Sequence, residues 1–570
     1  MKKYLLILTL LVTVGTQAQS FSFFTNLGSN LDDRATNIFV GPHGGVYLMG
    51  QADDTLFVPD NAGGITPISP VSPRNFFLTY IDNQGLHKWT KMFGYDVLNS
   101  AFARFTVNGN GQVVFLVAAD NFIKIETDSI PCNGNILNVI CTMDSLGNVL
   151  THHAAFNIIP DGTINEIKTD QQFNIYVSGT FRSSLELLTN GVLDSTISPA
   201  QPDKYAFIIK YDSAVNRLYT KQIGNEIYDF DFLSDKTCNL LVEAANGDSL
   251  KIDTAVYVPQ DLNRQQYLVK LDSAGKKMLC KQIGGANASN FNLLSMQHVQ
   301  NKFEVCGKLV DTANIDLQTL APTIPSDLAG NYEEIFSVQF DESTFQTSNM
   351  GSFSSYCQRG DQVFLKANSS GSLKYLVYNY LDSLGYDSVN NQNIQNENIA
   401  VKLFDANNNK IWTKGFRSNS DDFAQGLGLD VNDEAYVMGL FRDTMQVFDS
   451  LSIRYKTAHG NSISSANSII SKGGSDVFVG KISSQGNTTF ITKRSLNDFK
   501  VFPNPTNGLI NIYGAEGTFV VYDLLGNNMK SGIMNSTEAI ISLDEFKNGV
   551  YFIRLTNKKG ETQNVKIIKE

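Results

Sequence analysis

The sequence predicts an all-β protein, and three observations lead to this prediction. One strand–turn–strand phrase recurs along most of the 570-residue chain. Aromatic residues make up 11% of the chain and charged residues only 18%, a composition that is typical of β-rich extracellular proteins. Glycine is abundant, with 44 residues against 14 prolines, as expected for many tight turns between short strands.

The recurring phrase is an apolar strand that ends in Asp, followed by a tight turn and a second strand. Its turns fit type I geometry, with Asp at the first position and Gly at the fourth. An upstream strand, as in GGVYLMGQ and EAYVMGLF, and a short strand before it complete a unit of about four strands. Seven such units lie between about residues 21 and 496. The strands end at Asp82, Asp144, Asp212, Asp272, Asp341, Asp405 and Ser483.

The register downstream of these turns is also repeated. Position seven past the turn residue holds Trp89, Tyr219, Leu279, Trp412 and Phe490, and position nine holds Lys91, Lys221, Lys281 and Lys414. The only two tryptophans therefore share one repeat position. We interpret them as packing residues of the repeat, and a sugar-binding platform is the alternative.

A four-stranded unit of this size cannot bury both of its faces alone, so the units must stack on one another. Radial stacking gives a β-propeller, which leaves only short sheet edges. The phrases F-V-x-K-L-D-x-x-G and N-x-Y-V-x-G resemble the SBBP class of bacterial β-propeller repeats. We therefore predict a seven-bladed β-propeller over residues 19–496, with eight blades as the alternative. The N-terminal FSFFTNLG matches the strand after the Asp turn, and we expect it to close the ring by pairing with the last blade.

The first 18 residues have the three parts of a secretory signal peptide. They begin with basic residues, continue with an apolar run of about 11 residues, and end with small residues before a cleavage site. The run is too short to span a bilayer, which takes about 20 residues. We predict cleavage between Ala18 and Gln19, and no membrane span in the mature chain.

The last 74 residues, 497–570, form a separate pattern of short strands and turns. The pattern reads PNPTNG, then VVYDLLG, then NGVYFIRL. Some seven short strands predict a small Ig-like β-sandwich. The segment resembles a type A C-terminal sorting domain of the type IX secretion system, on the motif residues Pro503, Asn504, Pro505, Gly508, Tyr522, Asp523, Gly526, Gly549 and Tyr551.

This resemblance implies a route and a location. The protein would cross the periplasm, be recognised by the type IX secretion machinery through its tail, and end secreted or attached to the outer membrane at the cell surface.

Charge and cysteine content limit the partners. The net charge is -11 and the body has no basic cluster, which argues against nucleic acid or anionic lipid as a partner. Export permits disulfides, and Cys132 with Cys141 is the best local candidate pair. For Cys238, Cys280 and Cys306, buried free thiols in apolar strands are at least as well supported.

The sequence offers no catalytic, cofactor-binding or metal-binding motif. We interpret the recurring aspartates as residues of hairpin turns rather than of calcium loops, because a calcium loop needs several converging oxygen ligands. The carboxylate pairs Asp32-Asp33 and Asp421-Asp422 could bind an ion, and we expect them to face water. The histidines are scattered without zinc spacing, and no G-x-S-x-G elbow or P-loop occurs.

We therefore expect a binding, adhesion or structural module without a cofactor. Its ligand would be a glycan, a polymer or a protein held at propeller loops, above all at the two polar insertions over residues 380–398 and 459–474. The alternative is an exported hydrolase or lyase that acts on extracellular polymers with carboxylates or histidines brought together in the central channel. The side chains of that channel would distinguish the two.

Overall fold

The computed structural model describes two compact units, Met1–Thr489 and Phe490–Glu570. The described residues are 21–570 apart from 60–64, 98–100, 160, 200–203, 233–236, 245–248, 259–264, 284–290, 317, 323–331, 359–360, 382–396, 419, 449–467, 483, 485–499, 515, 524–526 and 558–561. All secondary-structure elements in these ranges are β-strands, so the all-β prediction is confirmed. No helix of this part of the chain could span a membrane.

The first unit is built from antiparallel sheets that follow one another along the chain, each with the four successive strands of one repeat at its core. The first three are β2 (Arg34–Val40), β3 (Val46–Gln51), β6 (Arg74–Ile81) and β7 (His87–Asp96); β8 (Ala101–Val107), β9 (Val113–Ala119), β12 (Ile136–Met143) and β13 (Val149–Ile159); and β14 (Gly162–Thr169), β15 (Ile175–Phe181), β18 (Tyr205–Tyr211) and β19 (Arg217–Gln222).

Three further sheets continue the series in the same strand order. They are β20 (Glu226–Phe232), β21 (Cys238–Ala244), β24 (Gln265–Leu271) and β25 (Lys277–Ile283); β26 (Phe291–Val299), β27 (Lys302–Leu309), β30 (Tyr332–Asp341) and β31 (Thr347–Gln358); and β32 (Val363–Ala367), β33 (Leu373–Leu381), β34 (Glu397–Asp405) and β35 (Lys410–Arg417).

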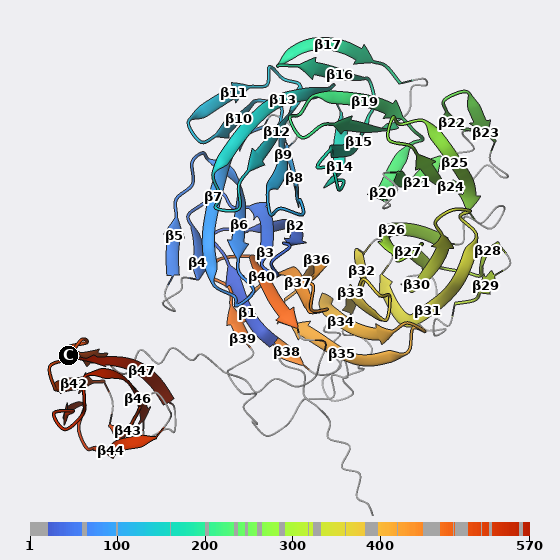
Figure 1. Cartoon of the computed structure of the whole chain (residues 1–570). Coiled ribbons are helices and arrows are strands. Elements are labelled where there is room, and N and C mark those ends of the chain that lie inside the picture. Colours follow the sequence, from blue (N-terminus) through green and yellow to red (C-terminus); the bar gives the residue numbers. More distant parts are fainter. Residues whose placement is uncertain are drawn as a thin grey trace, which may run out of the picture. The chain divides into compact units, whose positions relative to one another are not determined.

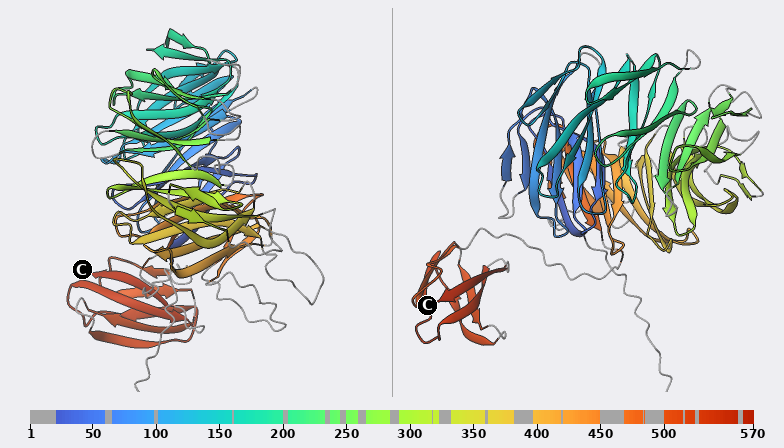
Figure 2. Two further views of the ribbon diagram at one scale, coloured as in Figure 1. Left: turned by 90° about the vertical axis from the view of Figure 1, so that its right-hand side faces the viewer. Right: turned by 45° about the horizontal axis from the view of Figure 1, so that its top comes forward.

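The last sheet joins the two ends of the repeat region. It contains β36 (Phe423–Leu429), β37 (Ala435–Phe441), β40 (Asp476–Ile482) and the N-terminal strand β1 (Phe21–Leu27). β1 pairs antiparallel with β40 from Phe21↔Ile482 to Leu27↔Val477, so the expected pairing of FSFFTNLG with the last repeat is confirmed. The sheets stand around a common centre, with the first strand of each innermost (Figures 1 and 2). The fold is that of a β-propeller.

The turn aspartates act as the sequence predicts. Asp82 accepts hydrogen bonds at Oδ1 from the backbone N–H groups of Gln84 and Leu86, both at 2.9 Å. Gly85 takes the left-handed conformation, with φ of 81°, which favours glycine. The same carboxylate contacts recur in four other repeats, at Asp144, Asp212, Asp272 and Asp405.

The seventh position past the turn packs one repeat on the next. Trp89 donates from Nε1 to the carbonyl O of Ser145 at 3.0 Å, and its ring lies on Gly147, where a Cβ would be only 2.8 Å from it. Tyr219 covers Gly275 of the following repeat in the same way, at 2.9 Å. The interpretation of these aromatic residues as packing residues is therefore confirmed for the first repeat.

Short hairpins cover the outer edges of the sheets, a feature that the sequence pattern did not predict. The part of the chain that the structure describes contains six of them: β4 (Leu56–Pro59) with β5 (Ile65–Ile68), β10 (Phe122–Ile125) with β11 (Asp128–Pro131), β16 (Ser184–Thr189) with β17 (Val192–Ile197), β22 (Leu250–Ile252) with β23 (Ala255–Tyr257), β28 (Ala313–Ile315) with β29 (Gln318–Leu320), and β38 (Thr444–Phe448) with β39 (Ser468–Ile470). Three of them pair with the preceding sheet, since β10 pairs with β7, β16 with β13 and β38 with β35. Such covering protects exposed sheet edges.

Two lysines of the repeated register hold these hairpins. Lys281 forms an ion pair with Asp316 at the tip of β28–β29, at 2.6 Å, and the same carboxylate accepts from the backbone N–H of Thr347 at 2.7 Å. Lys221 pairs with Asp253 in the β22–β23 tip. Each hairpin thus links the outer strands of two neighbouring sheets.

The described residues of the second unit form seven strands in two antiparallel sheets. One sheet is β41 (Lys500–Phe502), β42 (Leu509–Tyr513) and β45 (Glu538–Ser542); the other is β44 (Asn528–Met534), β43 (Gly517–Tyr522), β46 (Gly549–Asn557) and β47 (Thr562–Lys569). Ile512 and Ile541 of the first sheet share one buried cluster with Val521 and Ile553 of the second. The predicted domain boundary at 496–497 lies outside the described residues.

The proposed Cys132–Cys141 disulfide is wrong, because all six cysteines are free thiols. Cys132 precedes β12, whereas Cys141 lies within it, five residues and roughly 16 Å beyond Ile136. A disulfide needs Cα atoms within about 7 Å. Burial raises the pKa of the Cys132 thiol to about 12.

The expectation that the carboxylate pairs face water is wrong for one member of each. Asp33 is 1% exposed and Asp422 is fully buried. Asp422 accepts hydrogen bonds from the backbone N–H and the hydroxyl of Ser418, at 2.6 and 2.8 Å. Asp33 accepts the same two kinds of hydrogen bond from Ser29. Burial raises the pKa of each carboxyl to about 7. These side chains hold a turn together before the first strand of a sheet.

Candidate functional site

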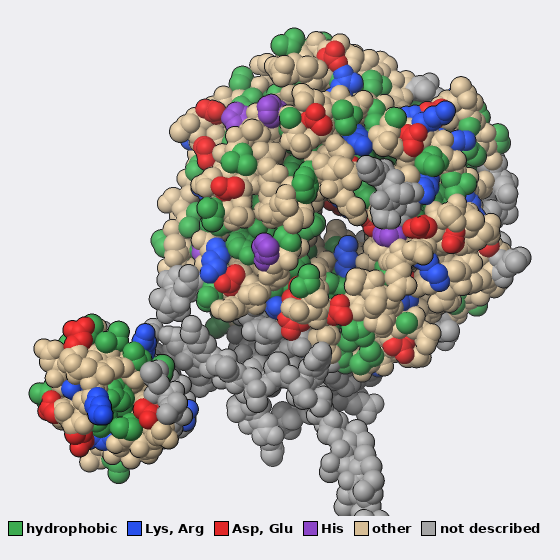
Figure 3. Space-filling view, in the orientation of Figure 1, with side chains coloured by type: hydrophobic (Ala, Val, Ile, Leu, Met, Phe, Trp, Pro, Cys, Tyr) green, Lys and Arg blue, Asp and Glu red, His purple; other side chains and the backbone are tan. Residues whose placement is uncertain are grey.

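A cavity of about 1390 Å³ lies at the centre of the ring of sheets. Its walls are formed mainly by the first strands of all seven sheets, β2, β8, β14, β20, β26, β32 and β36. Figure 3 shows its opening at the centre of the ring. The volume exceeds the ~300–1,000 Å³ of pockets that hold one small molecule.

Five of these strands carry a β-bulge at the same place. The pairing register shifts between Ala35 and Asn37 in β2, Ile164 and Glu166 in β14, Ile227 and Asp229 in β20, Leu293 and Ser295 in β26, and Ala424 and Gly426 in β36. A bulge adds one residue to a strand and re-aims its neighbours. Consecutive residues such as Asn165 and Glu166 beside the bulge of β14 line the cavity, and so do Arg104–Val107 of β8, which has no bulge.

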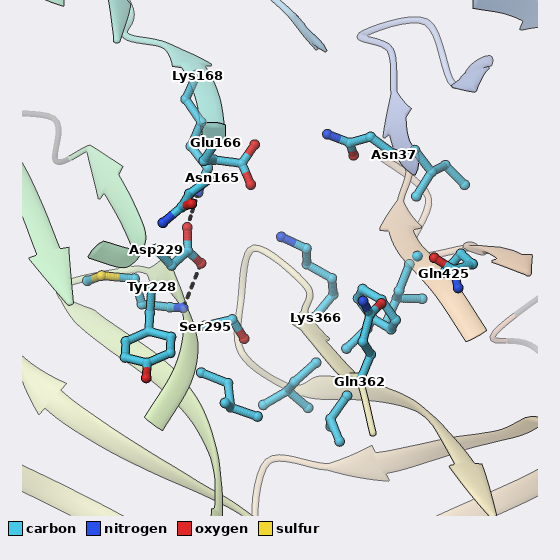
Figure 4. A pocket seen from close by; sticks show the side chains of 18 of the residues that line it. Asn37, Asn165, Glu166, Lys168, Tyr228, Asp229, Ser295, Gln362, Lys366 and Gln425 are labelled. Atoms are coloured by element: carbon cyan, nitrogen blue, oxygen red, sulfur yellow. Dashed lines mark hydrogen bonds and ion pairs between the residues drawn. The ribbon is translucent and has the colours of Figure 1, made fainter. Parts of the chain in front are cut away.

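One wall of the cavity, formed by β8, β14 and β20, carries charged side chains that are bound to neighbouring strands. Lys168 forms an ion pair with Asp229 at 2.6 Å and donates to the carbonyl O of Phe230 at 2.5 Å. Asp229 in turn accepts from the backbone N–H of Met296 at 2.9 Å (Figure 4). Arg104 donates to the carbonyl O of Asn165 at 3.1 Å. These groups join adjacent sheets.

Glu166 is the carboxyl of this wall that projects into the open space (Figure 4). Its one hydrogen bond within the described chain is a 3.3 Å contact from the backbone N–H of Ile167. Burial raises the pKa of the Glu166 carboxyl above its usual range, Asp229 adds to this effect, and Lys168 and Arg104 oppose it. Glu166 is thus available to a bound molecule, as an acceptor when ionised and as a donor when protonated.

The opposite wall, formed by β32, β36 and β2, presents an ammonium group and amides. Lys366, Gln362 and Gln425 have no hydrogen bond or ion pair with any described residue, and all three point into the cavity (Figure 4). The amide of Asn37 makes only a 3.5 Å contact with the carbonyl O of Phe105. This wall therefore offers one cation and several amide groups to a ligand.

The other candidates from the sequence do not gather into a site. Among the described residues, no group of three or more His, Cys, Asp and Glu side chains could hold a metal ion. His152 pairs with Asp128, and His298 with Glu342, each in a separate part of the fold. Of the two polar insertions, residues 382–396 and 459–467 lie outside the described residues. Trp412 packs against Tyr375, with ring centroids 6.0 Å apart.

In the second unit, the Pro-Asn-Pro segment is tied to the last strand of the chain. Asn504 donates from its side chain to the carbonyl O of Lys566 at 2.6 Å and accepts at Oδ1 from the N–H of Ile568 at 2.9 Å. Pro503 and Pro505 flank this contact. Directly after it, the N–H of Thr506 donates to the carbonyl O of Ile568 at 2.8 Å.

The other motif residues of this unit shape its turns. Gly508 is required because a Cβ there would lie 1.9 Å from Asp544. Asp523 accepts from the backbone and side-chain N–H groups of Asn527, at 2.9 and 2.8 Å. Tyr551 is buried and donates to the carbonyl O of Lys547 at 2.8 Å. The ring of Tyr522 lies under the guanidinium of Arg554. Gly549 has open space around its Cβ position. Gly526 lies outside the described residues.

Residues 500–570 match the family described as "Secretion system C-terminal sorting domain". The C-terminal unit is a type IX sorting domain. The protein is therefore secreted or attached to the cell surface, as the sequence predicted. The predicted cleavage site at Ala18 and Gln19 lies outside the described residues and stays a prediction.

Solved structures similar to the chain are distant. They include the WD40 domain of SCAP from fission yeast, at 9% identity over 80% of this chain and 97% of that one, with a TM-score of 0.32. The β-propeller domain of the Trilobed protease from Pyrococcus furiosus matches at 7% identity over 76% and 99%, with a TM-score of 0.31. A PL25 ulvan lyase matches at 9% identity over 73% and 93%, with a TM-score of 0.37. No curated protein sequence matches the chain significantly.

Deleting the sorting domain is expected to abolish export. A chain that ends at residue 496 keeps the propeller but loses the segment that matches the sorting family, so it should accumulate in the periplasm. Protease treatment of intact cells followed by fractionation measures this. Surface display of the truncated chain at the level of the full chain would contradict the assignment, and a tail of the same length with a scrambled sequence is the matched control.

Proposed function

We propose that this protein is an exported binding module whose central cavity holds an extended polar polymer, most simply a glycan. In this proposal the seven sheets are seven blades closed by β1, and the sorting domain is an Ig-like sandwich that delivers them to the cell surface. The ligand site then lies in the central cavity as well as at the loops that the sequence indicated.

The repeated bulge is the observation that carries the proposal. Five inner strands carry it at the same place, a bulge re-aims the side chains beside it, and polar side chains of these strands line the cavity. Amides and carboxylates that converge on a cavity are the groups that fix the orientation of a polar ligand. The size of the cavity suits several sugar units rather than one small molecule.

A binding screen with the full mature chain tests this function. We expect at least one glycan class to bind, and a Gln425→Trp variant to lose that binding, because the indole would fill space in the cavity. Gln84→Trp is the matched control, since Gln84 is exposed on a turn. Retained binding by the Gln425 variant would place the ligand elsewhere, and binding to no glycan would refute the proposal.

The second candidate function is an exported hydrolase or lyase. It is favoured by the position of Glu166, a carboxyl that projects into the cavity and whose pKa is raised by burial, as suits a general acid. Under this alternative the chain would turn over the glycan that it binds, and Glu166→Gln would abolish turnover while leaving binding in place. If the protein only binds its ligand, neither the natural chain nor the Glu166→Gln variant shows turnover.

A further inference from the structure

We infer that the ligand of the central cavity is an acidic oligosaccharide, whose carboxylate or sulfate binds Lys366. This inference rests on the proposed binding function and deepens it, because it names the chemical class of the ligand from the charges that face the cavity.

The first step concerns which cavity cations already have a hydrogen-bond or ion-pair partner within the chain. Lys168 is paired with Asp229 at 2.6 Å, and Lys308 with Glu333 at 3.3 Å. Arg104 donates to two backbone carbonyls, at 3.1 and 2.9 Å. Lys366 alone among the cations of the described lining has no such partner. An ammonium group in this position is open to an anion from outside the chain.

The second step concerns the acids that share the cavity with Lys366. Asp229 and Asp231 accept hydrogen bonds from the backbone N–H groups of Met296 and His298, at 2.9 and 2.6 Å. Asp361, at the end of the Lys366 wall, accepts from the N–H of Gln358 at 2.9 Å. These carboxylates are engaged in holding the backbone, which leaves Glu166 to face the ligand from the opposite wall (Figure 4).

The third step combines the two walls. Lys366 requires an anion, ionised Glu166 requires hydrogen-bond donors, and the amides of Gln362 and Gln425 supply both donors and acceptors. A ligand rich in hydroxyl groups that also carries a negative group meets all three requirements. A neutral sugar would leave the Lys366 ammonium without a counter-charge.

The test compares acidic and neutral oligosaccharides of equal length by isothermal titration calorimetry on the full mature chain. The probes are a galacturonate tetrasaccharide, a sulfated galactose tetrasaccharide, the neutral galactose tetrasaccharide, and free galacturonate and inorganic sulfate. We expect at least one acidic tetrasaccharide to bind about 10- to 100-fold more tightly than the neutral one, with an affinity that falls as salt is added. The two acidic arms distinguish carboxylate from sulfate.

Variants assign the effect to one side chain. Lys366→Met should remove the preference for the acidic ligand, and Lys366→Arg should retain it, whereas Lys302→Met, an exposed lysine outside the cavity lining, should change nothing. Equal binding of acidic and neutral probes, an unchanged preference in Lys366→Met, or binding of the free anions as tightly as the tetrasaccharides would overturn the inference and leave the binding function standing. Binding of no tetrasaccharide would overturn the inference, and binding of no glycan in the broader screen would overturn the binding function as well.

Discussion

Replacing Lys402 by methionine is expected to stabilise the protein at neutral pH by about 3 kcal/mol. Lys402 lies on β34 and is only 8% exposed, with its ammonium over the ring of Tyr378 at 5.3 Å. Its one hydrogen bond goes to the hydroxyl of Ser355 at 2.8 Å, and no described carboxylate pairs with it. Burial lowers the pKa of the Lys402 ammonium from 10.5 to about 8. Burying an unpaired charge in this way is costly.

The pH dependence of this effect has a defined sign. The folded state holds the proton of Lys402 less tightly than the unfolded chain does, so the cost is fully present below about pH 8. It fades as the pH rises from about 8 to 10.5. The difference in unfolding free energy between Lys402→Met and the natural chain should therefore be largest at pH 6–7 and small at pH 10.

Chemical denaturation across this pH range measures the effect of Lys402→Met. Lys410→Met is the matched control, because Lys410 is exposed on the next strand and its loss should change stability little at any pH. A Lys402→Met protein that is less stable than the natural chain at pH 7, or a stability difference that does not vary with pH, would contradict the account.

Replacing Gly147 by alanine is expected to destabilise the protein by about 3 kcal/mol. Two physical effects add up in this variant. Gly147 has a φ of 87°, which an alanine adopts only with strain, and a Cβ at this position would lie 2.8 Å from the ring of Trp89. Because Trp89 belongs to the preceding repeat, the clash would fall on the contact between the first two sheets.

Gly134→Ala separates the backbone effect from the packing effect. Gly134 has nearly the same φ, 80°, but nothing lies within 4 Å of its Cβ position. We expect Gly134→Ala to cost only about 1 kcal/mol. Thermal unfolding followed by tryptophan fluorescence measures both variants, since Trp89 is one of only two tryptophans. Equal losses in the two variants would show that Trp89 does not restrict this position.

The fold could be predicted from the sequence because its signals are local and repeated. The Asp turns, the alternation of apolar residues and the aromatic residue seven positions past each turn recur with the period of the sheets. Even the pairing of β1 with β40, which joins positions about 450 residues apart, could be predicted, because FSFFTNLG matches the strand that follows the Asp turn in the other repeats. The sorting domain was readable for the same reason, since Pro503 to Gly508 and Gly549 to Tyr551 are short contiguous motifs.

The candidate site was not predicted, because its determinants have no local signal. A bulge adds a single residue to β14, and nothing in the composition of that strand distinguishes Asn165 as the extra one. The wrong expectations share this cause. The separation of Cys132 from Cys141 and the burial of Asp422 depend on where the strands lie in space, which their spacing in the sequence does not fix.

The sequence by itself therefore determined the class of fold, the repeat and the destination of this protein. Each of these follows from periodicity or from a contiguous motif. Both kinds of signal can be recognised without knowing which residues lie opposite one another in space. Only the tertiary structure decided that seven inner strands surround one cavity, that Lys168 is neutralised by Asp229, and that Lys366 faces Glu166 without a partner of its own. Those facts depend on contacts between sheets that are distant in the chain, and the charges that a ligand meets are set by these contacts.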